Sequence, residues 1–147
     1  MIHKRHYHIP ASYLMLIKEQ RILLLRRFNT GYEDGNYSLI AGHAEAGETF
    51  TQCIIREAKE EVAIILQPKD VSVAHVMHRN TGDINNERVD VFFVATKWQG
   101  DITNTEPHKC DDLSWFDMDN LPSNTIPYIT HAIHCVHNQI QYSEYGW

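Results

Sequence analysis

Residues 42–64 read GHAEAGETFTQCIIREAKEEVAI, and this stretch carries most of the information about the fold. It opens with a loop containing two glycines and then continues without Gly or Pro to its end. Thr49, followed three residues later by Gln52, fits a capping box in which each residue hydrogen-bonds the other's backbone. A helix is therefore predicted to begin at this threonine.

The predicted helix concentrates negative charge on one face. Glu57, Glu60 and Glu61 share that face because residues three and four apart are neighbours on a helix, whereas Arg56 and Lys59 are predicted to point away from it. Each like-charged pair four residues apart costs about a few tenths of a kcal/mol. A solvated acidic face is one interpretation. A site for a hard divalent cation is the other.

Apolar segments surround this helix in the sequence. An apolar stripe on the helix itself is predicted to face a core; its members are Ile54, Ala58, Val62 and Ile65. Strands are predicted at 13–17, 21–27, 37–40, 71–78, 89–97 and 113–116, the first two as a hairpin. Proline in a first turn predicts a second helix over 127–139. Strands mixed with two separated helices predict an α/β or α+β sandwich.

Length and composition narrow the class of protein. A chain of 147 residues with 43% hydrophobic residues suits one domain over residues 1–147 with a core of its own. The net charge of −6 argues against sequence-independent binding to a nucleic-acid duplex. No long apolar run predicts a membrane span. The start of the chain lacks the pattern of a signal peptide, and three dispersed cysteines are typical of a reducing compartment, so a cytoplasmic location is expected.

The spacing within residues 42–64 resembles the signature of the Nudix hydrolases. Gly42 is followed after five residues by Glu48, after seven more by Arg56-Glu57, and then by Glu60-Glu61. The chain as a whole is similar to small MutT-like members of that family. The resemblance implies a Nudix-type α/β/α sandwich, with a mixed β-sheet between helices. The chain departs from the signature at Ala63, where the family has a glycine.

The resemblance also implies an activity and a metal. Nudix hydrolases use water and Mg²⁺ (or Mn²⁺) to cleave a nucleoside diphosphate linked to another group. By this resemblance the metal ligands are Glu57, Glu60, Glu61 and the carbonyl of Gly42. Glu57 and Glu61 also count as catalytic residues.

Two further roles follow from the same resemblance. Glu48 is expected to pair with Arg56 and hold the loop to the helix, a structural role. The catalytic base often lies on a loop nearer the C-terminus, where Glu106 is the first choice, with Asp111 and Asp112 as rivals.

The substrate is expected to be a small nucleotide. Motifs that mark other subfamilies are missing at their usual offsets, which favours a nucleoside triphosphate cut to the monophosphate and pyrophosphate. The alternatives are ADP-ribose or another nucleotide-linked diphosphate, or a nucleotide-binding Nudix module without turnover. Arg26, Arg27 and Arg79 are predicted phosphate contacts because guanidinium suits phosphate, with surface charges as the competing interpretation. The sequence is compatible with a homodimer.

Ten histidines are unusual for a chain of this length. His3, His6 and His8 crowd the N-terminus, and three more recur on the second predicted helix. Imidazoles bind transition metals. Exposed polar side chains are nevertheless the favoured interpretation for both groups.

Overall fold

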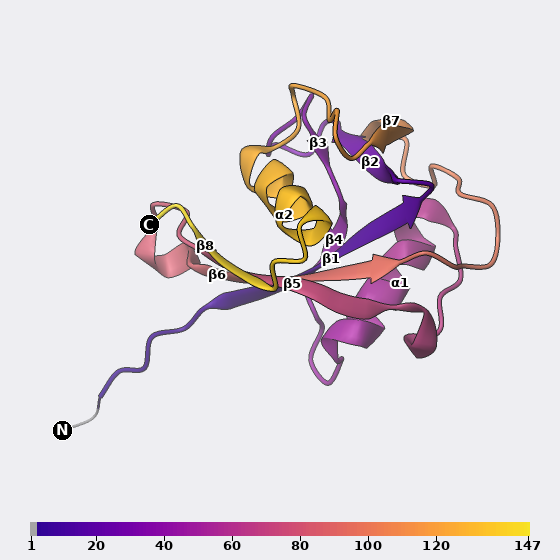
Figure 1. Cartoon of the computed structure of the whole chain (residues 1–147). Helices are drawn as coiled ribbons and strands as arrows, with labels where there is room; N and C mark the ends of the chain where they lie inside the picture. The colour runs from indigo at the N-terminus through magenta and orange to yellow at the C-terminus, as the bar shows by residue number, and fades with distance from the viewer. Residues whose placement is uncertain (1–2) are drawn as a thin grey trace.

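The computed structural model describes residues 3–147, whose strands form a mixed sheet between two helices (Figure 1). The strands are β1 (Ile9–Lys18), β2 (Arg21–Arg27), β3 (Tyr37–Ser38), β4 (Ile40–Gly42), β5 (Ser72–Arg79), β6 (Arg88–Ala95), β7 (Cys110–Asp117) and β8 (Tyr142–Tyr145). The helices are α1 (Phe50–Val62) and α2 (Pro127–His137), with short 3-10 turns η1 (Pro68–Asp70) and η2 (Ile84–Asn86). The strand order is β3-β2-β1-β6-β5-β8, while β4 pairs with β1 and β7 with β2.

Strand β1 is the centre of the sheet. It runs parallel to β6 over its length, from Ile9 beside Arg88 to Leu16 beside Ala95. Its other edge is shared, because β4 pairs with its middle residues, 12–14, and β2 pairs only with its last two residues. Strand β2 therefore diverges from β1 and pairs with β7 instead.

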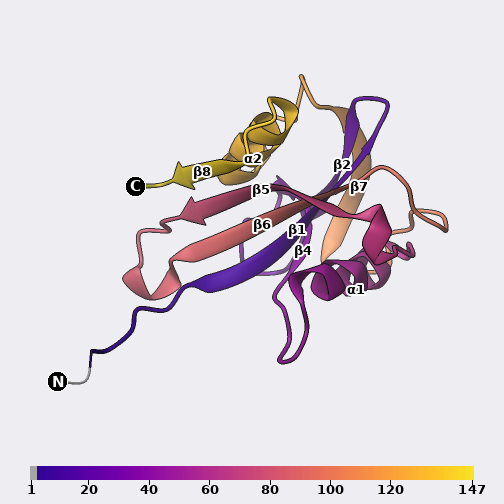
Figure 2. The ribbon, with the colours of Figure 1, turned by 60° about the horizontal axis from the view of Figure 1, so that its bottom comes forward.

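Side chains on the two faces of β1 belong to two different hydrophobic clusters. Tyr13 and Met15 pack in a cluster that includes α2, whereas Leu14 and Leu16 pack in a second cluster that includes α1. Successive side chains of a strand point to opposite faces, so a strand buried on both faces is apolar throughout. The two helices cover opposite faces of the sheet (Figure 2), and the predicted sandwich is confirmed.

The predicted elements are present, with corrections at their ends. The hairpin is confirmed, and Glu19 and Gln20 form its turn with φ of 53° and 61°. The strand predicted at 37–40 is two strands, β3 and β4, with different partners. The second helix ends at His137, earlier than expected. None of the helices in the described part of the chain is long and apolar enough to cross a membrane.

Two features of the elements differ from the sequence-based expectation. Ile65 does not belong to the apolar stripe of α1, because the helix ends at Val62 and Ile65 is 51% exposed. Strand β8 was not predicted, since its sequence is largely polar. It lies at the sheet edge beside β5, where the buried His75 hydrogen-bonds the Ile140 carbonyl and the Ser143 hydroxyl.

Candidate active site

Helix α1 fixes the position of the acidic residues. The side chain of Thr49 accepts a hydrogen bond from the Gln52 N–H at 3.1 Å, and the Gln52 side chain accepts one from the Thr49 N–H at 2.8 Å. This capping box satisfies two backbone groups that a helix start leaves unpaired. It therefore sets where the helix begins and which way the following glutamates face.

The acids of α1 line a cavity of about 540 Å³, called here the carboxylate cavity. Helix α1 contributes Glu57, Glu60 and Glu61, the loop before β7 contributes Glu106 and Lys109, and β2 contributes Arg27. Four carboxylates and two cationic side chains thus line the same cavity. Such an arrangement is suited to a multivalent cation and an anionic ligand together.

Glu61 has an unsatisfied atom. Its Oε2 is buried and has no hydrogen-bond partner among residues 3–147. Burial, and then the charges of Glu57 and Glu106, raise the pKa of Glu61 well above its usual value. A buried polar atom without a partner costs about 1–3 kcal/mol, so this position is unfavourable unless something binds to it.

Glu57 lies against the backbone at the end of β4. A Cβ on Gly42 would collide with the Glu57 side chain, so glycine at position 42 lets Glu57 keep this position. Burial raises the pKa of Glu57, while the hydrogen bond from Arg56 opposes that rise. The Gly42 carbonyl accepts a hydrogen bond from the Cys53 thiol at 3.6 Å.

Arg56 is part of the acidic cluster, and the prediction that it points away was wrong. Its Nη1 donates to Glu57 Oε1 at 2.8 Å and to Glu60 Oε2 at 3.2 Å. Its Nε and Nη2 donate to the two oxygens of Glu48 at 2.8 and 2.9 Å, which lowers the pKa of Glu48 to about 2. A long guanidinium side chain can reach around the helix, so the angular position of its Cα did not determine where the charge lies.

The three acids proposed for the catalytic base lie in different surroundings. Glu106 lines the carboxylate cavity, with Lys109 Nζ 3.6 Å from its Oε2. Asp111 accepts a 2.7 Å hydrogen bond from Arg26. Asp112 accepts hydrogen bonds from the Tyr37 and Ser114 hydroxyls. Of the three, Glu106 is the one that the fold brings beside the helix glutamates.

The three predicted phosphate-binding arginines are separated in the structure. Arg27 lines the carboxylate cavity. Arg26 is paired with Asp111 at 2.7 Å and is not among the residues that line this cavity. Arg79 is buried, donates to Asp90 Oδ2 at 2.6 Å, and lies with its Cζ 3.8 Å from the ring centroid of Tyr128. Its guanidinium therefore already has an anionic partner.

A second cavity, of about 770 Å³, is called here the tyrosine cavity. Tyr13, Tyr128 and Tyr145 line it, together with Arg79, Arg88, Gly42 and His43. Arg27 lines both cavities, so the two lie side by side at this residue. Arg88 Nη1 is 2.9 Å from His43 Nε2. Sequence reasoning missed Arg88 and His43 because only the parallel pairing of β1 with β6 and the loop path bring them together.

Comparison with known proteins decides the family. The family model of the NUDIX domain matches residues 6–133. The chain belongs to the Nudix family. A Nudix structure, the MutT NUDIX hydrolase from Burkholderia pseudomallei, superposes with a TM-score of 0.79 at 23% identity, over 87% of this chain and 97% of that one. This likeness shows the Nudix fold.

Two relatives in sequence are named for an enzymatic activity. The NAD-capped RNA hydrolase NudC of Stutzerimonas stutzeri is 31% identical over 120 residues, which are 81% of this chain and 41% of that protein. The ADP-ribose pyrophosphatase of Methanocaldococcus jannaschii is 30% identical over 105 residues, 71% of this chain and 59% of that protein. The chain thus spans less than two thirds of each of these relatives.

Proposed function

We propose that this Nudix protein hydrolyses a diphosphate linkage in a small nucleotide, with Mg²⁺ or Mn²⁺ held in the carboxylate cavity. The observation that carries the proposal is the buried Oε2 of Glu61, which has no hydrogen-bond partner within residues 3–147 and shares the cavity with Glu57, Glu60 and Glu106. A cation bound among these carboxylates would offset the cost of keeping them together.

The residues present fit a hard divalent cation. Glu57, Glu60 and Glu61 offer carboxylate oxygens in this cavity. Gly42, which lines the tyrosine cavity and lies against the Glu57 side chain, offers a carbonyl oxygen. These are the ligand types that Mg²⁺ and Mn²⁺ prefer. When bound, the ion would supply positive charge to phosphate oxygens and make water more acidic. Arg56, which bonds Glu48, Glu57 and Glu60, holds the carboxylates in position rather than contacting substrate.

A carboxylate must take the proton from the attacking water. We assign this role to Glu106, because it lies in the carboxylate cavity while Asp111 and Asp112 are engaged by other side chains. The raised pKa of Glu57 makes it the alternative proton acceptor. Arg27 and Lys109 on the same cavity would neutralise the substrate's phosphates.

Two substrate classes are compatible with this site. The first is a nucleoside triphosphate, which would be cut to the monophosphate and pyrophosphate. It is favoured because the sequence lacks the motifs that mark other Nudix subfamilies. A diphosphate joining two larger groups, as in ADP-ribose, is the second. It is favoured by the tyrosine cavity, which adjoins the carboxylate cavity at Arg27 and is large enough for a second nucleotide-sized group, and by the activities of the two relatives.

The test is a turnover assay with product identification. The protein would be incubated with Mg²⁺ or Mn²⁺ and nucleoside triphosphates, ADP-ribose, NAD or dinucleoside polyphosphates. ³¹P NMR in ¹⁸O-labelled water would show which phosphorus is attacked. Pyrophosphate released from a triphosphate supports the first class, and AMP released from ADP-ribose or NAD supports the second.

Absence of turnover across the whole panel with either metal would overturn the proposal and favour a nucleotide-binding module. Glu106→Gln tests the base and should lower kcat by about 10²- to 10⁴-fold without changing the melting temperature by more than a few degrees. The matched control is Asp111→Asn, which removes a rival acid outside the cavity. The cytoplasmic location and the homodimer stay predictions.

A further inference from the structure

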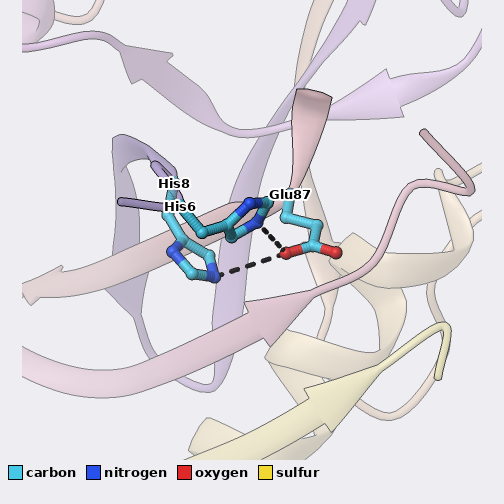
Figure 3. Close-up of side chains that lie close together, drawn as sticks. All are labelled: His6, His8 and Glu87. Atoms are coloured by element: carbon cyan, nitrogen blue, oxygen red, sulfur yellow. Dashed lines mark hydrogen bonds and ion pairs between the residues drawn. The ribbon is translucent and has the colours of Figure 1, made fainter. Parts of the chain in front are cut away.

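Histidines of the N-terminal segment, which precedes β1, lie beside a glutamate that directly precedes the neighbouring parallel strand β6. The N–H of Ile9 donates to the Glu87 carbonyl at 2.9 Å, so the segment before β1 runs beside the residue that precedes β6. His6 and His8 are two residues apart in an extended segment and lie on the same side. Both point toward the Glu87 carboxylate (Figure 3).

The donor atoms have the spacing of a metal site. His6 Nε2 is 2.6 Å and His8 Nε2 is 3.5 Å from Glu87 Oε2, and the three atoms all lie within 4.8 Å of one another. Ligands held at about 2.0–2.2 Å from a tetrahedral Zn²⁺ lie about 3.3–3.6 Å apart. Small side-chain movements would therefore place these three atoms around one ion.

A simple ion pair does not explain the whole cluster. One protonated histidine is enough to neutralise Glu87, yet a third imidazole adjoins, with His78 Nε2 3.1 Å from His8 Nε2. That contact is a hydrogen bond between two imidazole nitrogens and involves no carboxylate. Imidazole nitrogens gathered with a carboxylate oxygen are a donor set that Zn²⁺, Ni²⁺ and Cu²⁺ select over Mg²⁺.

We propose that His6, His8 and Glu87 form a transition-metal site, separate from the carboxylate cavity. Glu87 lies between Asn86 and Arg88, both of which line the tyrosine cavity. An ion bound here would tie the N-terminal segment to the rim of that cavity. The site would thus stabilise the loop that ends at β6, whatever nucleotide the protein hydrolyses.

The test measures the binding of Zn²⁺ by calorimetry and the binding of Co²⁺ by calorimetry and by its visible spectrum. Excess Mg²⁺ is present to occupy the carboxylate cavity. One ion per chain is expected, with a Co²⁺ spectrum of nitrogen and oxygen ligands. Both His6→Ala/His8→Ala and Glu87→Gln should weaken binding at least about tenfold.

Two control variants make the result specific. His3→Ala removes an exposed histidine of the same segment and should bind like the wild type. Glu61→Gln alters the carboxylate cavity and should also leave binding unchanged. Wild-type affinity in both His6→Ala/His8→Ala and Glu87→Gln would overturn the proposal. So would loss of binding in Glu61→Gln, because the ion would then occupy the carboxylate cavity.

Discussion

At the scale of single residues, the site depends on two unusual placements. Glu57 occupies the space that a Cβ would take at Gly42, so the backbone at the end of β4 and the helix side chain are in direct contact. Glu61 keeps an oxygen buried without a partner among residues 3–147. The first placement positions a carboxylate. The second leaves it ready for a cation.

Gly42→Ala should separate activity from stability. The new methyl group must displace the flexible Glu57 side chain, and a misplacement of about 1 Å can cost about 10²-fold in rate. We expect kcat to fall by about that factor while the melting temperature changes little. Steady-state kinetics and thermal unfolding on the same samples would check this.

Gly47→Ala is the matched control for that variant. Gly47 has φ of +80° with open space around it, so alanine there strains the backbone without touching Glu57. It should lower the melting temperature and leave the kcat of the folded protein unchanged. If Gly42→Ala behaved in the same way, the proposed contact would have no bearing on catalysis.

Glu61→Gln should make the metal-free protein more stable and abolish most turnover. The substitution removes a buried charge that Glu57 and Glu106 repel, so the free energy of unfolding near pH 8 should rise by about 1–3 kcal/mol. Denaturant unfolding with and without Mg²⁺ would measure it, and the added stability from Mg²⁺ should disappear. Glu45→Gln, at an exposed loop glutamate, serves as the control. Wild-type turnover in Glu61→Gln would contradict the assignment.

At the scale of the element, helix α1 is well specified at its start and strained at its end. The capping box of Thr49 and Gln52 agrees with the sequence pattern. Ala63, which replaces the glycine of the Nudix signature, adopts φ of 61° and ψ of 21° at the helix C-cap. An L-residue with a Cβ pays about 1–2 kcal/mol in this left-handed conformation.

Ala63→Gly should therefore stabilise the protein. Glycine removes the conformational penalty at position 63, but its greater freedom in the unfolded chain offsets part of that benefit. The free energy of unfolding should therefore rise by about 0.5–1 kcal/mol. Lys59→Gly, at an exposed position inside the same helix, should instead destabilise by about 1 kcal/mol. Chemical denaturation of both variants would check the opposite signs. Equal destabilisation would mean that the strain at position 63 is relieved elsewhere.

At the scale of the whole molecule, the sheet brings the site together. Strand β1 is buried on both faces and carries α1 on one side and α2 on the other. Because β2 diverges from β1 to pair with β7, the end of β2 and the loop before β7 meet α1. The carboxylate cavity thus combines three segments that are far apart in the sequence.

This assembly predicts how Mg²⁺ stabilisation depends on pH. Burial raises the pKa values of Glu57 and Glu61 above their usual 4.5, so stability without metal should fall as pH rises above that value. Mg²⁺ binds the ionised carboxylates, so the stability that it adds should grow over the same range. Melting temperatures with and without Mg²⁺, between about pH 5 and about pH 8, would check this. If the melting-temperature increase caused by Mg²⁺ were the same at every pH, Mg²⁺ would not bind at Glu57 and Glu61.

Much of the fold could be predicted from local patterns. Apolar runs located β1, β2, β5 and β6, because a buried strand must be apolar. Strand β8 escaped prediction because an edge strand can be polar, and its position depends on His75. The direction of the Arg56 side chain was predicted wrongly, because helical periodicity gives only the direction of Cβ. The guanidinium lies several bonds further out and turns toward Glu57.

The sequence by itself determined the family, the helix start and the face that carries Glu57, Glu60 and Glu61, because spacing along one helix is a local property. Only the tertiary structure decided that Glu106 joins these acids, that Arg79 is taken by Asp90, and which residues line the tyrosine cavity. Those placements depend on strand pairing between distant segments. No short stretch of sequence encodes them.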